Sequence, residues 1–416
     1  MNARTVSPAR RAAYEVVLRV FENGAYADRA LATAARELDS RDRALAQQIA
    51  YGTVQRARTL DHGIETLARR PLRKLDPPVR AALRTGAYQL AFLSGIASHA
   101  AVNETVELVR AVGLERAVSF TNAVMRRLSI GLQEVIEGLP QGPLALSYPD
   151  WVWDVWRRDL GEDEALALMR AQNEPPETVV RVMRGEIDGE ATDVLGALRV
   201  SRVDQNALEE GRIWPQSRGS ILAGLAVGSG PGERVLDLCA APGGKASQLA
   251  GEVVAVDKHE GRARELIENL RRLGRGDVRV VTADALELPP DLTGFDRALV
   301  DAPCSGLGVL NYRPDLRWRG EPLPELQLAL LRAAAERVKT GGTIVYSVCT
   351  INADENEAVV DASGLEVDDL GADWPAFRHP KRPEFLLTLP HLHRTAGFFI
   401  ARLRAPSDAR TPLRRP

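Results

Sequence analysis

The stretch RVLDLCAAPGGK, residues 234–245, starts as a short apolar run typical of a buried strand and continues as a turn of small residues. Small residues let a backbone approach a ligand closely, and a helix beginning near Lys245 would offer unpaired amide groups there. The turn matches neither the dinucleotide pattern GxGxxG nor the phosphate loops GxxxxGKS and GxxxxGKT. It therefore predicts a site for a nucleoside-like cofactor without a long phosphate chain.

Four more apolar runs follow this turn, with helical stretches between them: EVVAVD at 252–257, DVRVVT at 277–282, DRALVD at 296–301 and GTIVYS at 342–347. Strands that alternate with helices predict a parallel, doubly wound sheet of the Rossmann type. The run GFFIARLRA, which starts at Gly397, is expected to be a late edge strand. The C-terminal half of the chain is thus predicted to be an α/β domain.

Two acidic residues end strands of this sheet. Asp257 ends EVVAVD, a position from which a carboxylate can accept hydrogen bonds from both ribose hydroxyls of a cofactor. Asp284 ends the next strand on the same rim, and its alternative role is to cap the N-terminus of a helix. Together with the turn, these acids favour a nucleoside ligand.

The three cysteines of the chain are too few for a disulfide framework and lack the spacing of metal ligands, so we expect reduced thiols and no metal. Cys304 and Cys349 each follow a strand-like run, where catalytic groups lie in open α/β sheets. Cys239 lies in the cofactor turn and is expected to be a small buried residue without a chemical role. Two thiols at strand ends beside a cofactor turn suggest covalent chemistry on an electrophilic ring.

Length and composition predict several domains. A chain of 416 residues exceeds the size at which one core keeps growing. No apolar run reaches the roughly 18 residues that cross a bilayer, and the N-terminus lacks a secretory signal, so we expect a cytoplasmic protein without a membrane partner. We also expect it to be a monomer. Residues 1–130 hold 20 Lys and Arg against 12 Asp and Glu, a net +8, which leaves −10 for the rest. The N-terminal part is the expected polyanion-binding surface, although the arginine excess is equally explained by compositional bias.

Apolar residues recur at helical spacing from Pro8 to Leu128, which predicts a helical bundle. Expected helix boundaries lie at Asn23–Gly24, Asp39–Ser40 and Asp76–Pro77. We expect a helical domain at 1–140, a small mixed α/β subdomain at 141–225, a Rossmann-like domain at 226–405 and a flexible tail at 406–416.

Three motifs resemble those of RNA cytosine-5 methyltransferases that use S-adenosylmethionine: DLCAAPGGK at 237–245, DAPCSG at 301–306, and YSVCT at 346–350 followed by INADENE at 351–357. The helical segments ARRAAYEVVLRV, SRDRALAQQIAYGTVQ and FTNAVMRRL resemble a NusB-like RNA-binding domain. The combination resembles the B-type methyltransferases of bacterial small-subunit ribosomal RNA, the Sun or Fmu family, over nearly the whole chain. The resemblance implies ribosomal RNA, unassembled or partly assembled, as the partner.

The resemblance also implies the site residues. The cofactor would bind to the turn and to three acids: Cys239, Ala240, Ala241, Pro242, Gly243, Gly244, Lys245, Asp257, Asp284 and Asp301. Cys349 would be the nucleophile, with Cys304 assisting later in the cycle. The chain departs from the family at Val348, where threonine is common, and at Met183, where asparagine is common.

The chemistry explains why such an enzyme needs thiols. Carbon 5 of cytosine is a poor nucleophile until a thiolate adds to carbon 6. Asp301 could hydrogen-bond the N3 and amine edge of the base and draw charge from the ring. Either Cys349 or, as in DNA cytosine methyltransferases, Cys304 could attack; the second strand-end thiol favours Cys349. A bound water is the alternative to Cys304 for the release step.

The target base must leave its stack before such chemistry can occur. Four residues just after Cys304 are expected to hold RNA by charge and stacking, unless they pack inward: Tyr312, Arg313, Arg317 and Trp318. Two other functions compete with methylation of ribosomal RNA. One is the same reaction on transfer RNA or another RNA, and the other is a non-catalytic NusB-like RNA-binding assembly factor.

Overall fold

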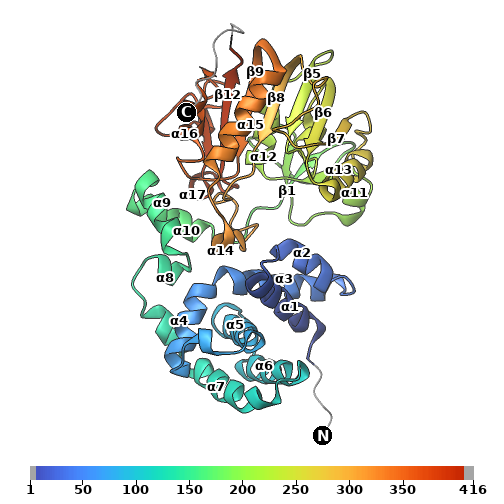
Figure 1. Ribbon diagram of the computed structural model, residues 1–416. Helices are drawn as coiled ribbons and strands as arrows, with labels where there is room; N and C mark the ends of the chain where they lie inside the picture. The colour runs from blue at the N-terminus through green and yellow to red at the C-terminus, as the bar shows by residue number, and fades with distance from the viewer. Residues whose placement is uncertain (1–5, 407–416) are drawn as a thin grey trace. The chain divides into compact units, whose positions relative to one another are not determined.

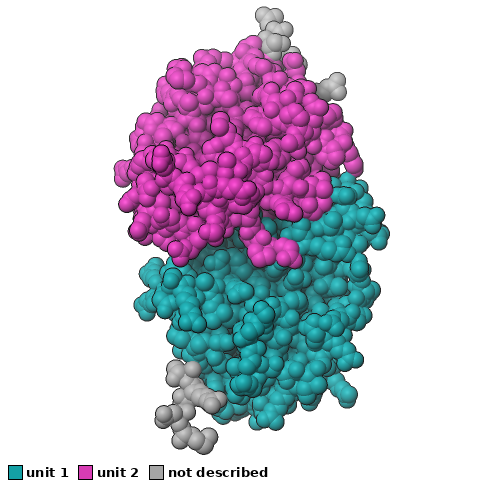
Figure 2. All heavy atoms as spheres, turned by 180° about the vertical axis from the view of Figure 1, so that it is seen from behind, with its two compact units in different colours: residues 1–173, 310–319 teal, residues 174–309, 320–416 magenta. Residues whose placement is uncertain are grey.

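A computed structural model describes residues 6–406 of the chain. It divides into two compact units, coloured separately in Figure 2. Unit 1 comprises residues 1–173 and 310–319, and unit 2 comprises residues 174–309 and 320–416. This division differs from the boundaries expected near 140 and 225, which remain a prediction about functional regions. Apart from Pro406, the expected tail at 406–416 lies outside the described residues.

Unit 1 is helical, as expected for the N-terminal part (Figure 1). Its long helices are α1 (Pro8–Asn23), α2 (Ala27–Ala34), α3 (Ser40–Gln55), α4 (Ala57–Ala68), α5 (Pro77–Phe92), α6 (Ser98–Ala111) and α7 (Glu115–Glu137). They are followed by α8 (Pro143–Leu146), α9 (Asp150–Leu160) and α10 (Glu162–Ala171), and the 3-10 turn η1 (Leu72–Lys74) precedes α5.

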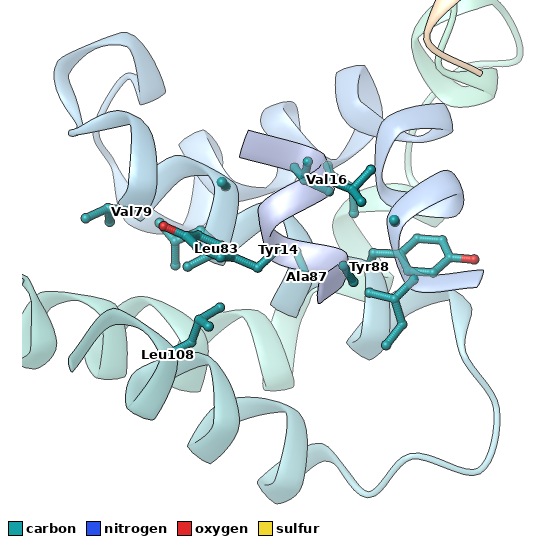
Figure 3. Packing of buried hydrophobic residues seen from close by; sticks show 14 of the residues in the cluster. Tyr14, Val16, Val79, Leu83, Ala87, Tyr88 and Leu108 are labelled. Carbon is teal, nitrogen blue, oxygen red and sulfur yellow. The ribbon is translucent and has the colours of Figure 1, made fainter. Parts of the chain in front are cut away.

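The predicted helix boundaries have local causes. Gly24 follows α1 in the left-handed region, with φ 61°, which glycine adopts without a steric penalty. The Asp39 side chain accepts a hydrogen bond of 2.8 Å from Asp42 N and caps α3. The buried faces of these helices form one apolar core, and Figure 3 shows Tyr14 and Leu83 within it.

The segment 310–319, which includes α14 (Leu316–Arg319), belongs to unit 1 although it follows Cys304 in sequence. Arg317 is fully buried there and donates to the carbonyls of Gln55 and Ser147 at 3.0 and 3.1 Å. Its guanidinium also lies 3.8 Å from the ring centroid of Tyr148. Trp318 packs against the core and donates to Val54 O at 2.7 Å. The expectation that Arg317 and Trp318 hold RNA is therefore wrong, because both side chains are occupied inside the unit.

Unit 2 begins with a small antiparallel sheet in the order β2-β3-β1-β4. Its strands are β1 (Val179–Val182), β2 (Glu190–Ala191), β3 (Ala197–Arg199) and β4 (Ile213–Pro215), with α11 (Gln205–Glu209) before β4 and α12 (Arg218–Ala226) after it. Val180, Ala207 and Ile213 form its buried core.

The large sheet has the order β10-β12-β9-β8-β5-β6-β7, and β11 also pairs with β12. Five strands are parallel, as predicted: β5 (Arg234–Leu238), β6 (Glu252–Asp257), β7 (Arg279–Thr282), β8 (Phe295–Asp301) and β9 (Val338–Val348). The antiparallel strands are β10 (Glu366–Asp368), β11 (Leu386–Thr388) and β12 (Phe398–Arg404). The helices of this region are α13 (Glu260–Arg272), α15 (Pro324–Arg337), α16 (Glu357–Ser363) and α17 (Pro390–His393), with the turns η2 (Ala246–Gln248) and η3 (Pro375–Phe377).

Two expectations about this sheet are wrong. β12 is an interior strand, because β9 pairs with it on one side and β10 and β11 on the other. This position agrees with its near-continuous burial, which an edge strand would lack. No α-helix follows the cofactor turn, since only residues 245–251 remain before β6 and they contain just the 3-10 turn η2. This turn therefore lacks the expected α-helix N-terminus, which would offer unpaired amide groups to a ligand.

We predict that Arg317→Met lowers the free energy of unfolding by roughly 3 kcal/mol, because several buried acceptors lose their donor. Burial lowers the pKa of Arg317 to about 10, but the side chain remains charged at neutral pH. Urea denaturation of the full chain measures the change. The exposed Arg319, replaced by Met, serves as the control and should cost less than about 1 kcal/mol. Unchanged stability with a loss of RNA affinity would restore the RNA-binding role of Arg317.

Candidate functional site

The carboxyl ends of the five parallel strands lie along one rim of the large sheet. The cofactor turn follows β5, Asp257 ends β6, Asp284 follows β7, Asp301 ends β8 and Cys349 follows β9. Parallel pairing thus brings residues from five separate motifs to the same edge. Every residue predicted for the site lies on this rim or on the loop after it.

The cofactor turn is compact and has little space for side chains. Cys239 adopts φ 63°, in the left-handed region that non-glycine residues seldom occupy, and Gly243 has φ 106°. A Cβ atom added to Gly244 would lie 2.6 Å from Trp214 Nε1, so a larger residue does not fit. The turn therefore needs glycine at 243 and 244 because the side chains of Leu266 and Trp214 pack directly against it.

Asp301 is held at both of its oxygens. Lys245 Nζ donates to Oδ2 at 2.7 Å, and Ser347 Oγ donates to Oδ1 at 2.7 Å. The Asp301 side chain retains 30% exposure, against 12% for Lys245. The ion pair links the cofactor turn to the end of β8.

The other two predicted acids differ in exposure. Asp257 is 3% exposed; its Oδ1 accepts from His259 N at 3.0 Å, and its Oδ2 lies 3.3 Å from an Arg262 nitrogen. Asp284 is 43% exposed and accepts from Leu286 N at 3.0 Å in a turn. No helix starts at Asp284, so the alternative role as a helix cap does not apply. Its exposed oxygens remain accessible to a ligand.

Sequence reasoning missed Asp237, the single acid within the apolar strand RVLDL. Its side chain is fully buried, and neither oxygen has a hydrogen-bond partner. Burial raises the pKa of Asp237 well above its usual range, and the nearby charge of Asp301 adds to the effect. The signal was present in the sequence, because a carboxylate inside a parallel strand is unusual.

The two strand-end thiols lie together. Cys304 Sγ and Cys349 Sγ are 3.4 Å apart, and Gly308 N donates to Cys349 O at 3.0 Å. The hydrogen bond from the Cys304 thiol lowers the pKa of Cys349, and Lys245 adds to this effect. The same contact raises the pKa of Cys304, because two adjacent thiols resist a second negative charge. The pair therefore holds one thiolate more readily than two.

Cys239 has a different environment. Burial raises its pKa to about 12, and the negative charges of Asp301 and Asp257 oppose ionisation further. A thiol that stays protonated is a weak nucleophile. This agrees with its expected role as a small residue of the turn. Among the residues described, no group of three or more His, Cys, Asp or Glu is arranged to hold a metal ion.

We predict that Asp237→Asn changes how stability depends on pH. The folded protein keeps the proton on Asp237 above the pH at which the unfolded chain releases it, so this residue makes stability fall as pH rises above about 4. The variant lacks this loss, so its advantage over the wild type should grow with pH, by up to about 1.4 kcal/mol per pH unit. Denaturant unfolding between pH 5 and 8 measures it. A constant difference would mean that Asp237 is ionised in the folded protein.

Comparison with known proteins identifies relatives along nearly the whole chain. Residues 225–404 match a family described as 16S rRNA methyltransferase RsmB/F, and residues 7–129 match the NusB family. The ribosomal RNA small subunit methyltransferase B of Thermus thermophilus is 37% identical, covering 86% of this chain and 85% of the relative. A Synechocystis protein named probable ribosomal RNA small subunit methyltransferase B is 33% identical, covering 95% and 99%. The crystal structure of PH0851 shares the fold, with a TM-score of 0.80 at 22% identity over 96% of this chain and 99% of that one.

Proposed function

Since the chain belongs to the RsmB/F family of 16S rRNA methyltransferases and carries a NusB-type domain, we propose that it methylates carbon 5 of a cytosine in small-subunit ribosomal RNA through a covalent bond from Cys349 to carbon 6. The family makes it an RNA methyltransferase that uses S-adenosylmethionine. The atom, the base and the covalent step are our proposal. The observation that carries it is the 3.4 Å contact between two thiols at the ends of neighbouring strands.

Bound S-adenosylmethionine supplies the electrophilic methyl group. The residues present fit this ligand, because the turn is built of small residues and Asp257 provides a buried carboxylate at the next strand end. We propose that residues 239–245 contact the ligand through their backbone. Asp257 would bind the ribose, and Asp284 and Asp301 would complete the pocket.

Cys349 supplies the nucleophile in this proposal. A thiolate adds to carbon 6 of cytosine, and electron density moves to carbon 5, which becomes able to take a methyl group. The hydrogen bond from Cys304 and the charge of Lys245 lower the pKa of Cys349 and favour its thiolate. Asp301 would hydrogen-bond the N3 and amine edge of the base while Lys245 and Ser347 hold its orientation.

Cys304 has the properties of a base for the release step. Its pKa is raised mainly by its contact with Cys349. Once Cys349 is bonded to carbon 6, it carries no charge, and this cause disappears. Cys304 can then lose its own proton to water and, as a thiolate, take the proton from carbon 5, while the bond between carbon 6 and Cys349 breaks and returns that sulfur as a thiolate. The two cysteines thus act in succession.

Unit 1 would bind the RNA. It contains a hollow of about 610 Å³ at the start of α5 and α7. Cations, acids and an aromatic ring line it: Arg70, Lys74, Arg116, Asp76, Glu115 and Phe120. Arg70 lies 5.7 Å from the ring centroid of Phe120. Three cations beside a partly buried ring suit a phosphate backbone with an unstacked base. No helix among residues 6–406 has the length and apolar character needed to cross a membrane.

We predict that Cys349→Ala abolishes methyl transfer, whereas Cys304→Ala forms the RNA adduct and fails to release it. Denaturing gels detect the adduct as a slowly migrating band.

Bisulfite sequencing of RNA from cells lacking the gene locates the methylated cytosine. Loss of one signal in small-subunit ribosomal RNA is expected. A lost signal in transfer RNA would support the alternative substrate. Normal methylation by Cys349→Ala would refute the covalent mechanism, and the absence of cofactor binding in calorimetry would favour a non-catalytic assembly factor.

We predict that the double variant Lys74→Glu/Arg116→Glu weakens RNA binding at least tenfold at about 0.1 M salt. The slope of log K against log salt should fall by about 1.4 to 1.8, since each phosphate contact contributes about 0.7 to 0.9. Filter binding over a salt series measures both quantities. The matched control Arg36→Glu/Arg41→Glu makes the same charge change at exposed positions outside the hollow. Equal losses in both variants would reduce the effect to net charge and exclude the hollow as a binding site.

A further inference from the structure

Glu355 is a fully buried carboxylate that accepts hydrogen bonds from three separate parts of unit 2. Its Oε1 accepts from Ser305 N at 2.9 Å, Gln327 Nε2 at 2.9 Å and Leu323 N at 3.2 Å. Its Oε2 accepts from the Ser305 hydroxyl and from Thr350 Oγ1 and Asn352 Nδ2, both at 3.3 Å. All of these donors are neutral. The negative charge is therefore dispersed over six hydrogen bonds instead of being paired with a cation.

The donors of Glu355 lie next to both thiols. Ser305 follows Cys304, and Thr350 follows Cys349. The two hydroxyls also contact each other, with Ser305 Oγ and Thr350 Oγ1 2.8 Å apart. One carboxylate oxygen thus contacts the residue after each cysteine. The loop after β8 and the end of β9 are joined through this oxygen directly beside the 3.4 Å contact of the thiols.

Glu355 has no free capacity for proton transfer in this arrangement. Its two oxygens already accept six hydrogen bonds, and the side chain is shielded from solvent. Its charge also opposes a thiolate on either cysteine, because a nearby negative charge disfavours a second one. Glu355 therefore does not help either cysteine to ionise. Its hydrogen bonds to the residue after each cysteine leave it a structural role, which is to hold the two loops in place.

We propose that Glu355 is a positioning residue that keeps Cys304 within reach of Cys349, so that release of the methylated base follows without delay. This inference rests on the proposed roles of the two thiols, although the positioning itself can be measured without RNA. Ser305 and Thr350 transmit the restraint. Gly308 adds a backbone hydrogen bond to Cys349 O and is not one of the six donors named above for Glu355.

Substitutions at this site should have graded effects. In Glu355→Gln, the amide group can take the place of Oε2, where the Ser305 and Thr350 hydroxyls can turn to accept hydrogen bonds. This variant should fold with a loosened connection. Glu355→Ala leaves several buried donors without an acceptor and should be less stable. Ser305→Ala and Thr350→Val each remove one hydroxyl and leave the carboxylate in place, so they test the connection if Glu355→Ala fails to fold.

The first measurement is the rate of disulfide formation between Cys304 and Cys349 in the free full-length enzyme. Diamide, a diazene oxidant, takes up two electrons and the two thiol protons and becomes a hydrazine as the sulfur–sulfur bond forms. Mass spectrometry of peptides follows the product. We expect Glu355→Gln to slow this reaction at least fivefold, and Ser305→Ala and Thr350→Val to slow it less. The matched control is Glu177→Gln, whose buried carboxylate pairs with Arg218 at 3.0 Å, and its rate should stay within twofold of the wild type.

The second measurement follows the covalent RNA adduct. Glu355→Gln should accumulate adduct as Cys304→Ala does, with affinity for S-adenosylmethionine within twofold of the wild type in calorimetry. A folded Glu355→Gln enzyme that forms the disulfide at the wild-type rate would overturn the positioning role. Disulfide formation that slows, with no adduct from any variant or from the Cys304→Ala enzyme, would instead refute the proposed covalent mechanism and leave the positioning role standing.

Discussion

Parallel pairing of β8 with β9 places Asp301 opposite Ser347, and the whole candidate reaction centre depends on this register. It brings the loop after β8 and the end of β9 to one rim, where Cys304 and Cys349 come within 3.4 Å. A shift by one residue would turn each side chain of β9 to the other face of the sheet. Lys245 then adds the cofactor turn to the same group of residues through its ion pair with Asp301.

The site concentrates buried charge, which a protein tolerates only where hydrogen bonds offset the loss of water. The buried carboxylate of Glu355 achieves this with six neutral donors, whereas that of Asp301 keeps 30% exposure and is contacted by one cation and one hydroxyl. Asp237 has no hydrogen-bond partner, and burial raises its pKa well above the usual range, which favours the protonated form. The three carboxyl groups therefore differ in how many polar atoms contact them.

Unit 1 shows the same principle away from the chemistry. Arg317 is buried, and its two terminal nitrogens donate to carbonyl and hydroxyl oxygens while the guanidinium lies over the face of Tyr148; its Nε has no hydrogen-bond partner. The segment 310–319 is thus held firmly in the helical unit, although its sequence lies within the α/β part of the chain. From sequence alone, an arginine and a tryptophan that follow a strand-end cysteine are expected to contact RNA, until the structure shows which groups they contact instead.

Sequence alone determined the helical first part, the five parallel strands, and the motifs that carry the cofactor turn, the acids and both thiols. These features are local, because periodicity, small residues in turns and strand-end positions are written in consecutive residues. The tertiary structure decided that β12 is interior, that Arg317 is buried and Trp318 packs against the helical core, and that Asp237 lacks a hydrogen-bond partner. It alone also revealed Glu355, whose donors Ser305 and Gln327 are 50 and 28 residues away in sequence. Hydrogen bonds between segments that are far apart in sequence depend on how the helices and strands pack in three dimensions, and no pattern of consecutive residues specifies that packing.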